Sequence, residues 1–270
     1  MVYLILSNFF YALNNLLWKR ALSKFNLWHI ISSRSLLTSI VGFIVIITFY
    51  SDVINTIDFP LFLNIFIASV FGSLGLICMI HALKKGSLSQ LALFNLIIVF
   101  LIGSFLFFFE SLHFENYRVA SLLIISGFVL YIYQIKKKNT QQMSLHQLLL
   151  FSLMSIFFAG SILMHWYGLK KDIPVIFSLS IQESVVFLSS ITIVIISPSF
   201  SLVKLRYELK KISTTAILMA TVIFAAIWTG FSGLKFTDPL ISSLISLLTP
   251  ILTILFLFLI VWQIVVLFLR

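Results

Sequence analysis

Few residues of this chain suit an aqueous surface. Only 10% of its 270 residues are charged, whereas soluble proteins carry about a quarter. Acidic residues number eight against eighteen Lys and Arg, and there are five prolines and one cysteine, Cys78. One cysteine excludes a disulfide within the chain, and no Cys/His cluster has the spacing of a metal site. We therefore expect no disulfide framework, no metal site and no cofactor.

The chain also lacks the motifs that carry enzymatic chemistry. There is no His-Glu-x-x-His helix, no Gly-x-Ser-x-Gly turn and no nucleotide-binding loop. Paired aspartates are absent from the apolar stretches. We expect a protein without catalytic residues, not an enzyme, and one that is not driven by its own ATP hydrolysis.

Long apolar stretches fill the sequence instead. Hydrophobic residues make up 61% of the chain, including 29 Phe. A bilayer core of ~30 Å needs about 20 apolar residues per helix, and only helices satisfy their backbone at that depth without the alternating pattern of a barrel. The sequence thus predicts an all-α, polytopic helical membrane bundle. The expected spans are 2–18, 28–49, 61–82, 88–109, 117–135, 145–167, 174–196, 213–234 and 240–262.

Lys and Arg are distributed unevenly between the two sides of this bundle. Fourteen of the eighteen lie in the breaks that follow odd-numbered spans, near the start of the second span or at the C-terminus. The positive-inside bias assigns that side to the cytoplasm and the N-terminus to the outside of a plasma (inner) membrane. The net charge of +10 is then explained by anionic headgroups, and we expect no nucleic-acid partner.

Two segments of the chain, 1–138 and 144–270, show a similar order of features. In each, a polar-studded span is followed by one that carries a charge: Arg34 precedes Ser35, and Glu183 precedes Ser184 at the matching place. With five spans in the first unit, the second starts from the opposite side. Inverted repeats of this kind are typical of transporters with a mid-membrane site between the halves.

At these positions the sequence resembles the drug/metabolite transporter superfamily, in its EamA-like branch. The best stretch runs from His81 to Ser89 and continues as an apolar helix to Glu110. Trp18, Lys19 and Arg34 fit the same pattern. So do a span from Tyr117 to Tyr133 with Gly127 in its middle and, in the second half, a span from Asp238 with Pro250 inside it. The resemblance implies two inverted five-helix repeats that move small organic solutes.

The chain departs from that pattern in two places. Ile97 stands where the family's first-half helix carries a proline, which predicts a straighter helix. After Gln263 only seven residues remain, and seven helical residues rise about 10 Å. The tenth helix is therefore expected to be missing, through truncation or as a nine-span variant.

Glu183 is the strongest candidate for a functional group. An ionised carboxylate inside a bilayer costs several kcal/mol unless it is paired, hydrated or protonated. This favours a proton-coupling role, with Arg34 as a partner if the repeat brings the two spans together. A structural ion pair between two helices explains Glu183 equally well.

Other polar residues at depth could line a cavity. Asn15 shares a face of the first span with Asn8, and Ser246 belongs to a hydroxyl stripe with Thr249 beside Pro250. Interhelical glue and hydroxyls bonded to their own helix are the alternatives. The candidate substrate-binding residues are Asn15, Arg34, Asn95, Glu183, Trp228 and Ser246.

These observations predict a membrane transporter of small organic metabolites working by alternating access, with proton-coupled export as one form. Alternatives are a flippase for lipid-linked cargo and a non-transporting membrane accessory protein. The expected partners are a small-molecule solute and the lipid bilayer.

Overall fold

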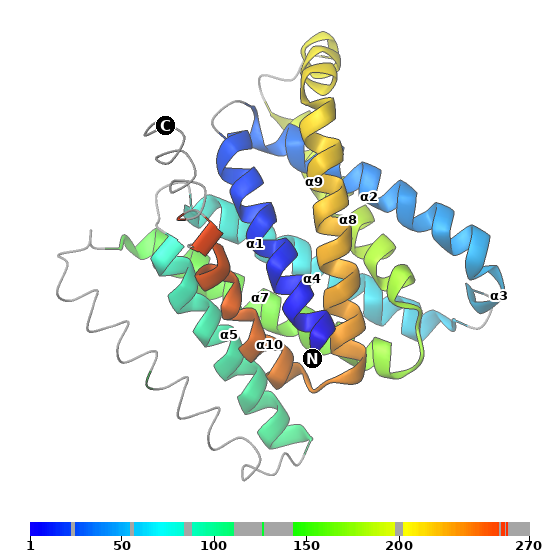
Figure 1. The fold of residues 1–270 in the computed structure, drawn as a ribbon, viewed down its shortest axis with the longest axis vertical. Helices are drawn as coiled ribbons and strands as arrows, with labels where there is room; N and C mark the ends of the chain where they lie inside the picture. Colours follow the sequence, from blue (N-terminus) through cyan, green and yellow to red (C-terminus); the bar gives the residue numbers. More distant parts are fainter. Residues whose placement is uncertain are drawn as a thin grey trace, which may run out of the picture.

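The computed structural model describes residues 1–22, 25–54, 57–83, 88–110, 126, 143–197, 202–253, 255, 256 and 258. Every regular element among these residues is a helix (Figure 1). The first half contains α1 (Val2–Leu22), α2 (Leu27–Phe49), α3 (Ser51–Ile54), α4 (Phe59–Leu83) and α5 (Leu88–Phe109). The second half contains α7 (Leu145–Lys170), α8 (Val175–Ile196), α9 (Leu202–Phe236) and α10 (Pro239–Ser246).

The length and apolarity of the helices make this a multi-pass helical membrane protein. In the described part of the chain, five helices are long and apolar enough to cross a bilayer: α2, α4, α7, α8 and residues 214–236 of α9. Large apolar side chains cover the outside of the bundle; Phe108 is 75% exposed and Ile47 is 68% exposed. Such a surface is stable against lipid tails and aggregates in water, which confirms the predicted helical membrane bundle.

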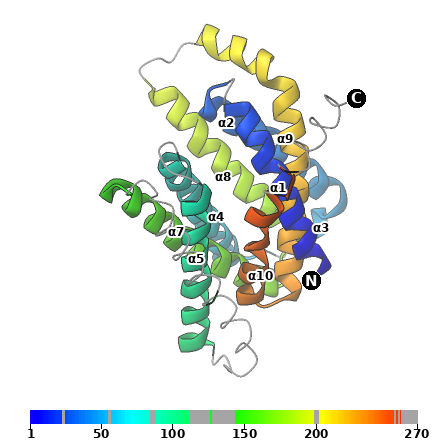
Figure 2. The same ribbon diagram turned by 60° about the vertical axis from the view of Figure 1, so that its left-hand side comes forward.

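The predicted spans coincide with helices wherever the chain is described, with two differences. The helix predicted over 213–234 extends back to Leu202, and Figure 2 shows this first part of α9 turning away from the rest of the bundle. The helix predicted over 240–262 is interrupted, because α10 ends at Ser246 and a turn at Leu247 precedes helical residues 248–253. Pro250 cannot donate the i→i−4 bond to Ser246, which weakens the helix at this point. The span predicted over 117–135 lies outside the described residues except for Ser126.

Several helices begin at residues whose side chains cap free backbone N–H groups. Asn26 accepts from the Trp28 N–H at the start of α2, and Asp238 accepts from the Leu240 N–H at the start of α10, where Pro239 occupies the first turn. Ser144 and Gln147 form a reciprocal capping box at the start of α7. These contacts satisfy donors that a helix cannot satisfy internally, and they set where the chain enters each helix.

The helices pack in pairs that repeat between the two halves. α4 packs along α7, and α1 packs along α9 in the same way; α2 packs along α8 (Figures 1 and 2). α2 also contacts α9, and α8 contacts α4. Exchanging α1 with α7, α2 with α8, α4 with α9 and α5 with α10 reproduces this set of contacts. The α2–α8 contact maps onto itself, as does the smaller α5–α10 contact.

Small residues allow the closest of these contacts. On α4, Gly72 and Gly75 lie against Ser161 and Phe158 of α7, where an added Cβ would come within 3.0 and 2.7 Å of side-chain atoms. On α9, Gly230 and Gly233 lie against Ser7 and Leu4 of α1 in the same manner. In both pairs the second glycine comes three residues after the first. Its partner comes three residues before the partner of the first glycine, so the two contacts have the same antiparallel spacing. Close backbone approach matters here because lipid gives no hydrophobic drive for helix association.

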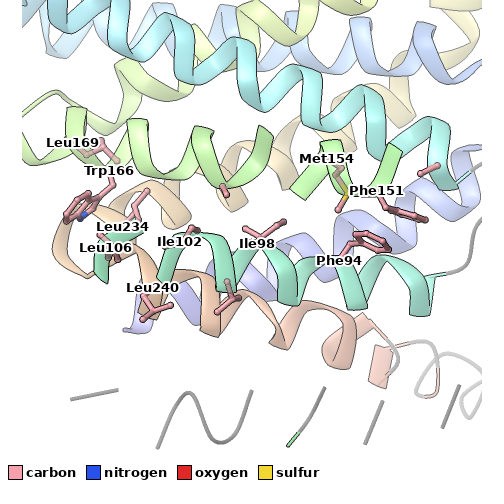
Figure 3. Close-up of a cluster of buried hydrophobic side chains, with 13 residues drawn as sticks. Phe94, Ile98, Ile102, Leu106, Phe151, Met154, Trp166, Leu169, Leu234 and Leu240 are labelled. Atoms are coloured by element: carbon pink, nitrogen blue, oxygen red, sulfur yellow. The ribbon is translucent and has the colours of Figure 1, made fainter. Parts of the chain in front are cut away.

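A buried apolar cluster joins α5 to the second half. Phe94, Ile98, Ile102 and Leu106 form a stripe with a spacing of four residues on α5, and this stripe meets Phe151 and Met154 of α7 (Figure 3). The rings of Phe94 and Phe151 stack with centroids 5.0 Å apart, and the Ser155 hydroxyl donates to the Phe94 carbonyl at 2.9 Å. Leu234 of α9 and Leu240 of α10 close the cluster at its other end (Figure 3). The cluster anchors α5 away from the α2–α8 contact.

Candidate polar site between α2 and α8

A buried ion pair joins the two helices that the exchange of halves maps onto each other. Arg34 Nη1 of α2 lies 3.1 Å from Glu183 Oε2 of α8, with side-chain exposures of 5% and 2%. The two residues occupy matching places in the two halves, so the pair maps onto itself. Arg34, named in the sequence analysis as a conditional partner, is in contact with Glu183.

The pair lies well inside both helices. Arg34 comes seven residues after Leu27 and Glu183 eight residues after Val175, which is about 11 Å from each helix start. Removing one partner of a buried ion pair leaves an uncompensated charge and costs about 3–5 kcal/mol. Each residue therefore holds the other in position.

The next turns of the contact are polar and tightly packed. The hydroxyl oxygens of Ser39 and Ser184 are 2.9 Å apart. Because Ser184 also bonds the Ser180 carbonyl, its single proton is used there, and Ser39 is the donor between the helices. Gly42 packs directly on the Ser180 side chain, leaving no room for a Cβ. α2 and α8 thus meet through an ion pair, a hydroxyl pair and a glycine contact.

Some hydrogen-bonding capacity at the pair is unused. Within the described part of the chain, the buried Arg34 Nε has no hydrogen-bond partner, and the same holds for Oε1 of Gln182, the residue next to Glu183. Buried polar atoms of this kind normally find a partner, since leaving one unpaired costs about 1–3 kcal/mol. The Gln182 amide lies beside Gly72 of α4 and not at the pair. The unused group at the pair itself is Arg34 Nε, which can donate one hydrogen bond to a polar molecule.

Tyr11 of α1 is a further member of this site. It lies within electrostatic range of both Glu183 and Arg34 and packs against the apolar cluster around Ile46, Phe177 and Ile227. Its position places a phenol beside an ion pair in an otherwise apolar wall. Its signal in the sequence is weak, because it is one tyrosine among the polar residues of the first span.

Asn15 belongs to a different contact. Its side-chain amide donates to the Thr253 hydroxyl at 3.3 Å, and one turn away the Thr249 hydroxyl donates to the Asn8 amide oxygen. These two bonds join α1 to the helical residues after the break at Leu247. They have the geometry of interhelical hydrogen bonds, one of the two interpretations considered for Asn15.

Asn95, Trp228 and Ser246 lie apart from the ion pair. Asn95 is half-buried on α5. Trp228 is 39% exposed and packs edge-on against Phe224, on the same outward face of α9 as Ile217 and Thr221. Ser246 is exposed and donates to the Ser243 carbonyl of its own helix. The three residues lie on three different helices and do not form one site with the ion pair. A substrate role for them stays a prediction.

A second buried polar residue, His165, occupies the place on α7 that Tyr11 occupies on α1. The pairing of Ser161 with Gly72 and of Ser7 with Gly230 sets this correspondence. His165 is 1% exposed, its ring lies 4.6 Å from that of Phe231, and neither ring nitrogen has a hydrogen-bond partner among the residues that the structure describes. The two halves thus present a phenol and an imidazole at equivalent points.

The residues that sequence reasoning missed are small and polar. Ser39, Gly42, Ser180 and Ser184 complete the contact around the charges, and Tyr11 borders it. A run of Ser and Thr on one face of α2 and α8 was the available signal. Such hydroxyls also bond their own helix, as Thr38 does to Arg34, so the pattern does not by itself mark an interface.

Comparisons with known proteins give no family for this chain. No family model matches it, and no curated protein matches it.

Proposed function

We propose that this protein is a membrane transporter that moves small organic metabolites by alternating access, on the plan of the drug/metabolite transporters of the EamA-like branch. The observation that carries the proposal is the buried Arg34–Glu183 pair at the contact between equivalent helices. Charged side chains inside a membrane are rare and are typically found on substrate and ion pathways. In transporters built from inverted repeats, the site lies between the halves near mid-membrane.

The repeated packing supports the same mechanism. α1 with α9 and α4 with α7 form two equivalent layers, each combining one helix from each half, and α2–α8 lies on the exchange axis. Rocking that interchanges the two layers would open the site to one side and then to the other. We place the protein in the plasma (inner) membrane with its N-terminus outside, from the distribution of Lys and Arg.

Solute counterflow in proteoliposomes tests the proposal. Purified protein is first screened by ligand-dependent thermal stabilisation across a metabolite panel, and stabilising solutes are then assayed for exchange. We expect exchange with the native chain and at least a tenfold loss in the R34Q/E183Q variant, which removes both charges together. Thr221→Val is the matched control, because Thr221 is exposed on α9 and bonds its own helix. Equal exchange in R34Q/E183Q and the native chain would contradict the proposal.

Proton coupling through Glu183 stays a prediction, and its partner weighs against it. Protonating Glu183 would leave the Arg34 charge uncompensated inside the membrane, at a cost of several kcal/mol. The test is Glu183→Gln assayed with and without a pH gradient. Loss of gradient-driven transport with retained counterflow would support the proton role, and unchanged dependence on the gradient would remove it.

A further inference from the structure

In the spanning helices that the structure describes, the charges away from the helix ends sum to zero. In the five described helices that are long and apolar enough to cross a bilayer, with α9 counted from Thr214, Arg34 and Glu183 are the Asp, Glu, Lys or Arg residues away from the helix ends. Lys170 and Lys235 lie in a last turn. Glu183 is also the single Asp or Glu within any apolar stretch of the sequence. The two charges are already 3.1 Å apart and compensate each other.

This balance restricts what the site can hold. An organic cation could pair with Glu183 only by displacing Arg34, and an anion could pair with Arg34 only by displacing Glu183. Either exchange leaves one buried charge without a partner, and a buried unpaired charge is strongly unfavourable. A molecule without net charge leaves the pair, or its charge balance, intact.

The polar groups at the pair match such a molecule. Arg34 Nε can donate, and this atom is buried and unpaired within the part of the chain described. Tyr11 adds a hydroxyl within electrostatic range of both charges and can donate or accept. A polar solute with its own donor and acceptor would satisfy these atoms.

We propose that the solute bound at the Arg34–Glu183 pair carries no net charge, being either an uncharged polar metabolite or a zwitterion, and that organic cations and anions are rejected. This inference rests on the proposed transport function and specifies its substrate class. It also implies that the pair stays ionised through the cycle, so that transport moves no net charge.

Pairs of solutes that differ in net charge test the proposal on the purified full-length chain. Glycine betaine is compared with choline, glucose with glucose 6-phosphate, and further pairs follow the same rule. Binding is measured by thermal stabilisation, and exchange by counterflow in liposomes. The net-neutral member of a pair is expected to bind about a hundredfold or more tightly than its charged counterpart, and its transport is expected to give no current on a supported membrane.

Three variants test the charge argument through solute preference, which is compared among the variants that fold. E183Q leaves the site with a net positive charge, and its preference should move toward the anionic member; R34Q should move toward the cationic member. The swap R34E/E183R restores balance with the same two groups and should keep the preference for neutral solutes. A merely structural ion pair predicts no change in charge preference among those variants that fold.

The outcomes separate this inference from the function on which it rests. If the native chain exchanges a cation or an anion as strongly as the neutral counterpart, the proposed substrate class is wrong. The proposed transport function is then still supported. A pH-driven current that disappears in E183Q also overturns the proposed substrate class. If no solute in the panel binds or exchanges, the proposed transport function is refuted, and this inference with it.

Discussion

Arg34 and Glu183 contribute to stability as a pair and not as individuals. The cost of burying each charge is offset only by the other, at 3.1 Å and with 5% and 2% exposure. Burial distinguishes this interior pair from a surface pair such as Lys235–Asp172, in which the Asp172 side chain is 92% exposed. Surface pairs of that kind contribute little to stability.

We predict that R34Q and E183Q each lower the free energy of unfolding by about 3–5 kcal/mol, because each strands one buried charge. The double variant R34L/E183L should recover most of this loss, since apolar replacement of both partners is often close to neutral. Unfolding in detergent of the native chain, R34Q, E183Q and R34Q/E183Q gives the double-mutant cycle, and R34L/E183L is measured beside these four proteins. Additive losses in R34Q/E183Q would show that the two side chains are not coupled.

Gly42 is the residue at which space is most restricted in this contact. We predict that Gly42→Ala destabilises the protein by about 1–3 kcal/mol, as is typical for overpacking, because a Cβ would collide with Ser180. Combining it with Ser180→Gly should restore stability in the same unfolding assay. Gly103→Ala is the control, since its Cβ would meet Leu240 at an ordinary contact distance of 3.4 Å. Equal losses at the two glycines would contradict the account.

At the scale of elements, the two halves differ in one equivalent helix. α5 is continuous from Leu88 to Phe109 and has Ile97 at the position where the family pattern has a proline. α10, by contrast, ends at Ser246, four residues before Pro250. The residues after the break are attached to α1 by the Asn8–Thr249 and Asn15–Thr253 bonds. After the break, the hydroxyls of Thr249 and Thr253 face α1. Ser246, before the break, bonds its own helix instead.

The α2–α8 contact maps onto itself, so we predict that it is preserved in both access states. In a Cys78→Ser background, S39C/S184C should form a disulfide, since the native hydroxyls are 2.9 Å apart, and should keep counterflow within about twofold of the reduced protein. N15C/T253C, across α1 and the segment after the break, should reduce exchange on oxidation if that segment moves. Full inhibition by the first cross-link would exclude α2–α8 as a fixed axis.

At the scale of the whole molecule, the order of helices fixes which loops share a side. α7 crosses the membrane between His146, exposed at its start, and Asp172, exposed just beyond its end at a positive φ of 62°. We predict that a membrane-impermeant maleimide labels D172C and not H146C from outside intact cells, in the Cys78→Ser background. The opposite labelling would reverse the orientation, and labelling of both would contradict a single crossing by α7.

The sequence by itself determined that this chain forms helices and that they lie in a membrane. Apolar stretches of about twenty residues have only one way to satisfy their backbone in lipid, so the spans and most of their boundaries follow from composition. The positions of α1, α2, α4, α5, α7 and α8 agree with it to within a few residues. The extension of α9 to Leu202 and the break at Leu247 were not visible, because hydropathy does not report a polar helical extension or a lost backbone bond.

Only the tertiary structure decided which polar residues meet. The sequence made Arg34 a partner of Glu183 only if the two spans met, and the packing of α2 on α8 meets that condition. Asn15 contacts Thr253 instead, and Trp228 lies on the outer face of α9. The depth of a side chain in the membrane follows from its position along one helix. Its contact partner, however, depends on how each helix is rotated about its own axis. That rotation is set by close contacts such as Gly42 on Ser180 and Gly230 on Ser7, between residues more than a hundred positions apart.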